Sequence, residues 1–483
     1  MNLQQQANQL EKEGKNREAL DIYAQLIDKE PNNFRHYNSA AVVLYKLSRF
    51  KDAVKLFEKT IMIEPKYAEA YSNLGAIHAK FKNFSYAIKC YQKSIELKPS
   101  YAGAYTNLGN SLNKSHEYEQ AVYFHLQAIS RDDTASNHFA NCGSAYKNLG
   151  RFDKAEWMYK KALSLEPNHI NAHFDLATVL LQVGKFKEGW EHYEWRMKKD
   201  EMRGHLKTYH DIFSKPLWCG EDLKAKRIMI HSEQGFGDSL QVARYFYNLK
   251  ALGAYVIVYT RQGLEGLFEA MSCVDKVQVR GEEPEHFDYQ LPMMSLAHCL
   301  DENLKNIIEH YPYLKAPKQR VLLPKRKTKI RIGLCWGASN TGESYDKKVL
   351  KLSGFEKILY HDDYEVISLQ LGDDAQQQKS YHDRIIDVSE NITDFSATAS
   401  IIKQCDVIIS SDTSVAHLAG AMGKPTWILL QKVPDWRWGV DSKESLWYPS
   451  VTLFRQYSLG SWHDVYERVF DELKNFEVNK NAN

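Results

Sequence analysis

The loop at 234–238 carries a carboxylate that could act as a general base. It reads Gln-Gly-Phe-Gly-Asp and lies between an apolar strand expected at 227–231 and a helix expected near 239–252. The two glycines permit tight backbone geometry, and Asp238 falls at or near the start of the helix. A carboxylate in that place either caps the helix or faces a crevice and removes the proton of an acceptor hydroxyl. Glu233 is the alternative base.

A second loop has the composition of a phosphate-binding site. Residues 411–420 read Ser-Asp-Thr-Ser-Val-Ala-His-Leu-Ala-Gly, after an apolar strand and at the start of a helix of small residues. Hydroxyls and backbone N–H groups at a helix N-terminus bind phosphate, which makes Asp412, Thr413 and Ser414 candidate ligands. Helix capping alone would also explain Asp412 or Thr413. His417 is read either as a further ligand or as a core histidine satisfied by its neighbours.

A third loop also follows an apolar strand. It reads Trp-Gly-Ala-Ser-Asn at 336–340 and precedes the adjacent lysines Lys347 and Lys348. Gly337 and Ser339 would let a ligand approach the backbone closely, and either lysine could neutralise a phosphate. Solvated surface charges explain the two lysines equally well.

These loops require parallel sheets that bring strand ends together. Apolar strands at 227–231 and 255–260 flank the first loop, and a second strand–helix series begins at KIRIGLCWGAS and ends at CDVIISSDTSVAHLAGAMGKPTWILL. Such β-loop-α-β units build parallel sheets, which bind ligands beyond the carboxyl ends of their strands. We expect two Rossmann-like lobes with a crevice between them, at 226–316 and 317–476, followed by a tail at 477–483.

A different pattern, with a period of 34 residues, fills the first 198 residues. Small, aromatic and proline residues each recur at this spacing: Ala19, Ala53, Ala87, Ala121 and Ala155; Tyr23, Phe57, Tyr91, His125, Tyr159 and Tyr193; Pro31, Pro65, Pro99 and Pro167. A small residue lets two helices approach, an aromatic residue fills the gap and a proline ends the second helix. The pattern resembles the tetratricopeptide repeat (TPR) and predicts an α superhelix, a solenoid, over 1–198, with a linker or docking segment at 199–225.

Asparagines recur in the first helix of successive repeats. Asn73, Asn107 and Asn141 keep the 34-residue spacing, with Ser39 and Asp175 in the flanking repeats. Stacked repeats would align these amides along one inner face, where a side-chain amide could pair with the backbone of a polypeptide of any sequence. The alternative is that these asparagines cap or brace neighbouring helices.

Composition excludes several classes of partner. Lys plus Arg is 63 and Asp plus Glu is 61, a net charge of +2, so nothing predicts binding to nucleic acid or to an anionic membrane. No apolar run approaches the roughly 18 residues of a spanning helix, and the polar N-terminus has no signal-peptide core. Seven scattered cysteines without a C-x-x-C pair indicate free thiols in a reducing compartment. We expect a cytoplasmic protein with about three domain-sized units.

Several short motifs resemble one enzyme group over essentially the whole chain. GFGD, WGAS, SLQ, DTSVAHLAGAMGKPTWILL, DWRW and WYPSVTLFRQ are similar to those of bacterial TPR-linked glycosyltransferases of the GT-B fold, whose catalytic lobes resemble heptosyltransferases. The resemblance implies that Asp238 deprotonates the acceptor and that Lys348, or the adjacent Lys347, is the basic donor ligand. It also implies that Gln370 lies near the nucleotide. The donor phosphates would be bound by Asp412, Thr413, Ser414 and His417.

Two segments depart from the pattern of that group. A His followed by an Asp-Arg-x-Arg-like stretch is usual after W-G, whereas this chain has Asn340 and then Asp-Lys-Lys at 346–348. The usual Asp-Thr-Ala is here Ala-Thr-Ala at 397–399. Both departures leave the donor open.

The resemblance and the residues together predict a glycosyl transfer without a metal. A base for the acceptor and a helix N-terminus with a lysine for the leaving phosphate supply the required chemistry, and no D-x-D triplet occurs. We expect an inverting displacement that needs no cofactor, with the nucleotide-sugar as substrate. The loop at 435–438, Asp-Trp-Arg-Trp, either faces the sugar or acceptor or packs structurally.

The expected function is transfer of a sugar to Ser or Thr of a polypeptide held by the TPR solenoid. Within the resembling group, flagellin as acceptor and CMP-pseudaminic or CMP-legionaminic acid as donor are the best-known pairing. Two alternatives stay open: transfer to a glycan or lipid-linked acceptor, and a TPR scaffold with inactive glycosyltransferase-like lobes.

Overall fold

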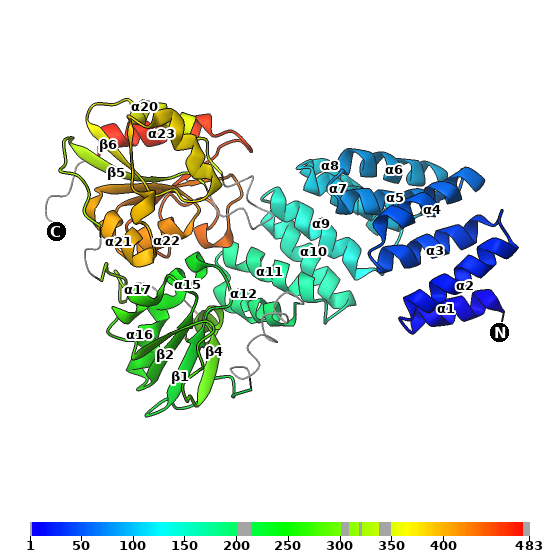
Figure 1. Ribbon diagram of the computed structural model, residues 1–483, viewed down its shortest axis with the longest axis horizontal. Coiled ribbons are helices and arrows are strands. Elements are labelled where there is room, and N and C mark those ends of the chain that lie inside the picture. The colour runs from blue at the N-terminus through cyan, green and yellow to red at the C-terminus, as the bar shows by residue number, and fades with distance from the viewer. Residues whose placement is uncertain (1, 200–213, 301–308, 318–320, 338–348, 477–483) are drawn as a thin grey trace. The chain divides into compact units, whose positions relative to one another are not determined.

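The computed structural model describes residues 2–199, 214–300, 309–317, 321–337 and 349–476 (Figure 1). The chain forms two compact units, Met1–Leu176 and Ala177–Asn483. All seven cysteines are free thiols. No helix among the described residues is long and apolar enough to cross a membrane.

The first unit is an array of antiparallel helix pairs, as the 34-residue period predicts. Each helix packs on the next one along the chain, and each pair packs on the following pair. The helices are α1 Leu3–Lys12, α2 Asn16–Lys29, α3 Phe34–Lys46, α4 Phe50–Ile63, α5 Ala68–Lys80, α6 Phe84–Leu97, α7 Ala102–Lys114, α8 Tyr118–Ile129, α9 Ser136–Asn148, α10 Phe152–Leu165 and the first half of α11 Ile170–Gln182. The predicted α superhelix is confirmed.

Glycines in the first helices of the repeats, together with the aromatic series in the second helices, explain how the two helices of a pair approach. A Cβ atom added to Gly75 would lie 2.9 Å from the ring of Tyr91, and one added to Gly143 would lie 2.9 Å from the ring of Tyr159. Real Cβ atoms do not approach rings so closely, so the aromatic side chains fill the space that the glycines leave. Side chains of the aromatic series are almost fully buried.

His125 occupies the same place in its repeat, against Gly109, but its ring is polar. The side chain is fully buried, and among the described residues neither ring nitrogen has a hydrogen-bond partner. Burial, with a smaller effect of His138, lowers the pKa of His125 to about 3. The first unit therefore contains a neutral imidazole whose polar atoms are unsatisfied.

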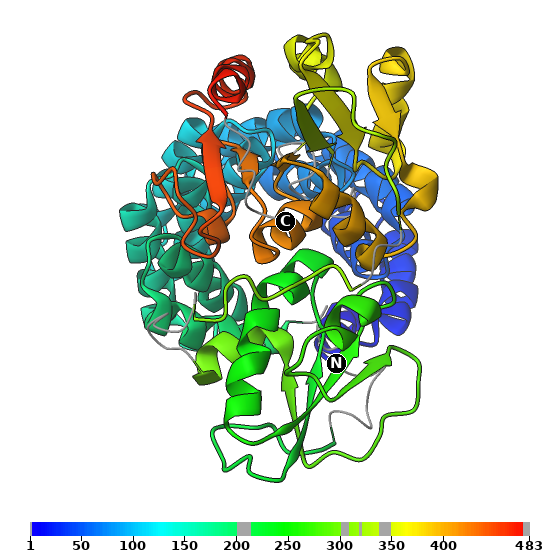
Figure 2. The ribbon, with the colours of Figure 1, turned by 90° about the vertical axis from the view of Figure 1, so that its left-hand side faces the viewer.

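The second unit contains two parallel sheets, drawn in green and in yellow to red in Figure 2. The first has the strand order β3-β2-β1-β4. Its strands are β1 Arg227–His231, β2 Tyr255–Thr260, β3 Lys276–Val279 and β4 Tyr289–Pro292; its helices are α15 Phe236–Val242, η2 Ala243–Tyr245, α16 Phe246–Ala251, α17 Glu265–Glu269, η3 Met293–Ser295 and α18 Leu296–Leu300. Strands β1 and β2 have the predicted bounds. The helix expected near 239–252 begins earlier, at Phe236, because Gly235 is its N-cap, and a 3-10 turn interrupts it.

The second sheet has the strand order β10-β9-β8-β5-β6-β7, also parallel throughout. Its strands are β5 Ile330–Cys335, β6 Tyr364–Ser368, β7 Ile385–Asp387, β8 Val407–Ser411, β9 Thr426–Leu430 and β10 Val451–Arg455; its helices are η4 Leu352–Phe355, α20 Glu356–Leu359, η5 Asp373–Tyr381, η6 Ser389–Asn391, α21 Phe395–Gln404, α22 Ser414–Ala421, η7 Trp436–Trp438 and α23 His463–Lys474. Strands β5, β8 and β9 are buried along their whole length, as expected for a sheet covered on both faces. Two Rossmann-like lobes are confirmed.

The last helices of the predicted solenoid belong to the second unit. Helix α12 (Phe186–Tyr193) and the 3-10 turn η1 (Glu194–Lys198) follow α11. Trp190 of α12 is 1% exposed and meets Trp436 with ring centroids 5.3 Å apart. The units divide at Leu176, inside α11, since the residues that follow pack on the two lobes.

Of the expected docking segment at 199–225, the structure describes residue 199 and residues 214–225. In the second of these stretches, the backbone carbonyl of Gln290 in β4 accepts a hydrogen bond from the N–H of Trp218 at 3.0 Å. The backbone N–H of Gln290 donates to the carbonyl of Pro216, also at 3.0 Å. This short stretch therefore extends the first sheet at its β4 edge.

His125→Phe is expected to stabilise the protein at pH 7 by about 1–3 kcal/mol, because it removes unsatisfied buried polar atoms. The wild-type histidine stays neutral when folded but binds a proton in the unfolded chain, whose ordinary pKa is near 6.5. The free energy of unfolding of the wild type should therefore fall as the pH is lowered from about 6.5 towards 3. The part of this fall that comes from His125 should be missing in the variant. Urea unfolding of the full chain at pH 7 and pH 4 measures both effects.

Tyr91→Phe is the matched control for that substitution, because it changes the same place in a neighbouring repeat without altering a group that titrates between pH 3 and pH 7. A His125→Phe protein that keeps the acid sensitivity of the wild type would contradict the assignment to His125.

Candidate active site

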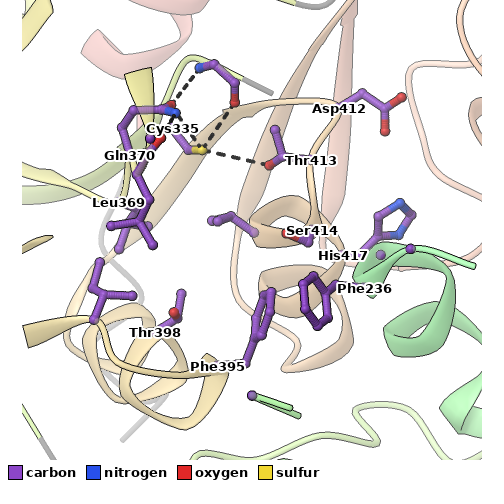
Figure 3. A pocket seen from close by; sticks show the side chains of 18 of the residues that line it. Phe236, Cys335, Leu369, Gln370, Phe395, Thr398, Asp412, Thr413, Ser414 and His417 are labelled. Carbon is purple, nitrogen blue, oxygen red and sulfur yellow. Dashed lines mark hydrogen bonds between the residues drawn. The ribbon is translucent and has the colours of Figure 1, made fainter. Parts of the chain in front are cut away.

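A pocket of about 1130 Å³ lies between the two lobes of the second unit. Its walls are the start of α21 and loops at the carboxyl ends of β1, β2, β5, β6, β8 and β9, the place where parallel sheets bind ligands. The lining residues are Gly235–Asp238, Arg261–Gly263, Cys335, Gly337, Leu369–Asp374, Ile392–Phe395, Thr398, Asp412–Val415, His417, Asp435 and Arg437. Figure 3 shows part of this wall, with the α22 residues facing Phe236 and Phe395.

Asp238 braces the start of its helix and also lines the pocket. Its side chain is 22% exposed and lines the pocket, while Oδ2 accepts a hydrogen bond of 2.8 Å from the N–H of Gly235 at the start of α15. Oδ1 is ion-paired with Arg437. The carboxylate is thus both a brace of the glycine loop and a group at the pocket wall.

Glu233, the alternative base, is not among the residues that line the pocket. Its Oε1 lies 3.0 Å from Nη2 of Arg196 and accepts the N–H of Met294 at 3.2 Å. Burial raises the pKa of Glu233, and the charge of Arg196 opposes this shift. The structure gives Glu233 a buried ion pair with the turn that follows α12, and its role as the alternative base stays a prediction.

The start of α22 forms one side of the pocket. Thr413 is the N-cap residue, and its hydroxyl lies 2.9 Å from that of Ser410 at the end of β8. Asp412, Thr413 and Ser414 all line the pocket, so the structure brings the predicted phosphate ligands to the same cavity as Asp238. The N-terminal end of α22 carries the positive end of the helix dipole.

His417 joins the two predicted loops. Its side chain is buried, its Nδ1 lies 2.8 Å from the hydroxyl of Tyr448, and its ring stacks on Trp438 with centroids 5.0 Å apart. A Cβ atom added to Gly237 would lie 2.8 Å from its Cδ2 atom. His417 is therefore a packed residue at the pocket wall, and the second glycine of GFGD is needed because this ring leaves no room.

Gln370 lines the pocket, but its amide also holds the loop that begins at Trp336. Oε1 accepts the N–H groups of Trp336 at 3.0 Å and of Gly337 at 2.6 Å, and Nε2 donates to the carbonyl of Leu371 at 2.8 Å. This amide fixes Gly337 at the pocket wall. Figure 3 shows the side chain of Gln370 beside Cys335.

The remaining predicted donor residues and the Ala-Thr-Ala segment that departs from the family pattern are treated differently by the structure. Ser339, Lys347 and Lys348 lie outside the described residues. Thr398 of the Ala-Thr-Ala segment is in α21 and lines the pocket, while the helix start is capped by Asp394, which accepts the N–H of Ala397 at 2.7 Å.

Arg261, Phe236 and Phe395 are among the lining residues that were not singled out from the sequence. Arg261 directly follows β2, so the rule that ligands meet strand ends could have found it. Phe236 and Phe395 come from different lobes, and their rings lie 5.0 Å apart at 49°. The N–H of Phe395 also donates to the carbonyl of Gly263 at 3.0 Å, so this contact joins the lobes on the wall near Arg261.

The described part of the pocket wall is acidic. It carries six aspartates against two arginines: Asp238, Asp373, Asp374, Asp394, Asp412 and Asp435, with Arg261 and Arg437. An anionic ligand would therefore depend on local donors, such as the α22 N-terminus, more than on the overall charge of the wall. Among the described residues, no group of three His, Cys, Asp or Glu side chains is arranged to hold a metal ion.

Comparison with known families identifies the helical array. Models of the tetratricopeptide repeat match residues 5–68, 68–101, 90–123, 139–169 and 158–191. The array consists of tetratricopeptide repeats. The TPR solenoid thus has the repeat type that its small, aromatic and proline series predict.

One curated relative shares more than the TPR solenoid. Protein FlbA of Caulobacter vibrioides is 25% identical over 340 residues, covering 63% of this chain and 55% of that protein. The chain therefore spans about half the length of this relative. Because the aligned share is longer than the solenoid, the similarity includes part of the two lobes.

Solved structures of TPR proteins are similar to part of this chain. TTC0263 of Thermus thermophilus is 20% identical, with a TM-score of 0.33, over 37% of this chain and 96% of that one. YrrB, described as a TPR protein with an unusual peptide-binding site, is 23% identical, with a TM-score of 0.29, over 34% of this chain and 86% of that one.

The asparagine series of the TPR solenoid lies on α5, α7 and α9. Asn73, Asn107 and Asn141 are all half-buried. Nδ2 of Asn73 donates to Oδ1 of Asn38 in the preceding repeat at 3.3 Å, so bracing of neighbouring repeats is observed at this position. In the flanking repeat, Asp175 pairs with Lys147 at 3.2 Å. Binding of a polypeptide by the three amides stays a prediction.

Gly237→Ala should displace the ring of His417 and destabilise the second unit by about 1–3 kcal/mol, as overpacking does. The double substitution Gly237→Ala with His417→Ala should be less unstable than the sum of the two single changes, because removing the ring relieves the clash. Urea unfolding of the four proteins measures this coupling. Strict additivity would show that the two residues do not share the contact described above.

Proposed function

We propose that this protein is a protein O-glycosyltransferase that moves a sugar from a nucleotide-activated donor to Ser or Thr of a polypeptide. One observation carries the proposal: a single pocket brings Asp238 of the first lobe together with the start of α22 in the second lobe. A base for an acceptor hydroxyl and a helix N-terminus for a leaving phosphate are the two groups that a displacement at a sugar carbon requires.

In the proposed reaction, Asp238 accepts the proton of the acceptor hydroxyl as its oxygen attacks the anomeric carbon. The bond to the nucleotide phosphate breaks on the opposite side, so the anomeric configuration inverts. The N–H groups and hydroxyls around Thr413 and Ser414 would stabilise the charge on the departing phosphate. No step in this scheme needs a metal. Lys347 or Lys348 would add positive charge to the same site.

The dimensions of the pocket suit a nucleotide-sugar. Its volume of about 1130 Å³ slightly exceeds the roughly 300–1,000 Å³ usual for ligand sites, which leaves room for both the nucleotide and the sugar. In the proposed complex, the donor would lie against Gly337 and Gln370 on one side and the α22 start on the other. Phe236 and Phe395 offer an apolar wall.

The acceptor would be bound by the TPR solenoid through Asn73, Asn107 and Asn141. Flagellin in the cytoplasm as acceptor and a CMP-linked nonulosonic acid as donor complete the proposal, and the resemblance of the lobe motifs to TPR-linked glycosyltransferases supports this choice. The intact GFGD and DTSVAH segments at the pocket favour an active enzyme over a scaffold with inactive lobes.

A thermal-shift panel with CMP, UDP, ADP and GDP tests donor binding. A ligand that binds only the folded protein stabilises it by mass action, by about 2.7 kcal/mol at 100 times its Kd. We expect one nucleotide to raise the Tm clearly above the others. No shift with any nucleotide at millimolar concentration would count against a nucleotide-sugar donor.

Asp238→Asn should lower the transfer rate by about 10²–10⁴-fold, the usual contribution of a general base, and leave nucleotide binding intact. Transfer is followed as a mass increase of the acceptor. Asp383→Asn is the matched control, because Asp383 is exposed and does not line the pocket, so its transfer rate should equal that of the wild type. Full activity of Asp238→Asn would remove Asp238 from the mechanism.

Changing Asn73, Asn107 and Asn141 together to Ala should impair modification of the polypeptide while sparing hydrolysis of the donor. The reason is that the three amides would act on the acceptor and not at the pocket. The ratio of the two rates is the measurement, with Tm as the check on folding. Equal losses in both rates, or unchanged acceptor use, would exclude the asparagine series from acceptor binding.

A further inference from the structure

Arg437 links the two lobes at the pocket wall. It lies in η7, on the loop that follows β9 of the second lobe, and its side chain is 8% exposed. Nη2 pairs with Oδ1 of Asp238, and Nε donates to Oε1 of Gln241 at 2.7 Å. Asp238 and Gln241 are separated by three positions on α15 of the first lobe, so one guanidinium spans the first turn of the helix that carries the proposed base.

The guanidinium is itself held from its own loop. Nη1 donates to Oδ1 of Asp435 at 2.7 Å, and the guanidinium carbon lies 4.2 Å from the ring centroid of Trp436. Trp436 packs against Trp190. Arg437 is therefore fixed before it reaches Asp238, as a side chain that positions another group must be.

The same contacts use three of the five N–H groups of the Arg437 guanidinium. Each of its three side-chain nitrogens already donates to a protein oxygen: Nε to Gln241, Nη1 to Asp435 and Nη2 to Asp238. A phosphate could reach only the two remaining N–H groups, one on each Nη atom, of a guanidinium that two carboxylates hold in place.

The Asp238 carboxylate keeps capacity for a substrate. An ionised carboxylate offers about four lone-pair sites on two oxygens. Arg437 uses a site on Oδ1 and the N–H of Gly235 uses one on Oδ2. The remaining sites of this pocket-lining group can accept the proton of a hydroxyl, in an orientation fixed from both sides.

We propose that Arg437 is a positioning residue that orients the Asp238 carboxylate from across the lobe boundary, so that the base is assembled only when the lobes are in contact. This inference rests on the proposed function of Asp238 as the base. Arg437 acts through Asp238 and touches neither the donor nor the acceptor.

The first test is kinetic. Arg437→Gln should lower kcat by about 10²-fold, the usual effect of misplacing a catalytic group by about 1 Å, and leave the KM for the donor unchanged. Arg437→Lys keeps the charge without the planar fork and should recover part of the loss. A raised donor KM with unchanged kcat would overturn the proposal and make Arg437 a donor ligand.

The second test is the double substitution. In an Asp238→Asn background, Arg437→Gln should cause no further loss of kcat, because the group through which it acts is already missing. Arg244→Gln is the matched control: Arg244 also crosses the lobe boundary, donating to the carbonyl of Trp447 at 2.8 Å, but does not contact Asp238. Arg244→Gln should therefore lower kcat by the same factor in the Asp238→Asn background as in the wild type. If Arg437→Gln also lowered kcat by the same factor in both backgrounds, the positioning role would be overturned.

A stability cycle separates this inference from the proposed function. Thermal unfolding of the wild type, Asp238→Asn, Arg437→Lys and the double variant needs no substrate. The two changes should lower the Tm by less together than the sum of their separate effects. Additive Tm losses would overturn the proposed positioning of Asp238 by Arg437, even in an active enzyme. Strong coupling in a protein that transfers no sugar would support the Asp238–Arg437 contact and reject the proposed function.

Discussion

The pairing of Asp238 with Arg437 is the contact on which the arrangement of the pocket depends. It connects the first turn of α15 in one lobe to the loop after β9 in the other, beside the close approach of His417 to Gly237. A buried ion pair is costly to desolvate and strongly destabilising to break by removing one partner. The pair contributes to the geometry of the pocket, because it joins the two lobes where the Asp238 carboxylate and the N-terminus of α22 line the same cavity.

The end of the TPR solenoid takes part in this arrangement. Tyr193 donates to Oε1 of Gln234 at 3.1 Å in the glycine loop, Arg196 pairs with Glu233, and Trp190 packs on Trp436. The residues on either side of the Asp238–Arg437 pair are therefore supported by α12 and η1. This explains why the compact unit that holds the pocket begins within α11 and not at the linker.

The helical repeats and the loops at the strand ends could be predicted from the sequence. The 34-residue series predicts the TPR solenoid because each repeat solves the same local packing problem, and apolar strands followed by glycine or hydroxyl residues predict loops that meet at one edge of the sheets. The partner of Asp238 could not be predicted, since 199 positions separate it from Arg437 and no local pattern encodes the pair. The same holds for Glu233, whose carboxylate faces Arg196, and for the amide of Gln370, which holds the backbone at Gly337.

The most direct test of the account is a crystal structure of the Asp238→Asn protein with an intact nucleotide-sugar bound. The account predicts the donor phosphates at the N–H groups of Thr413 and Ser414, with the anomeric carbon turned towards the position of the Asp238 side chain. A nucleotide bound outside the pocket, or bound in it with the sugar directed away from position 238, would contradict the account.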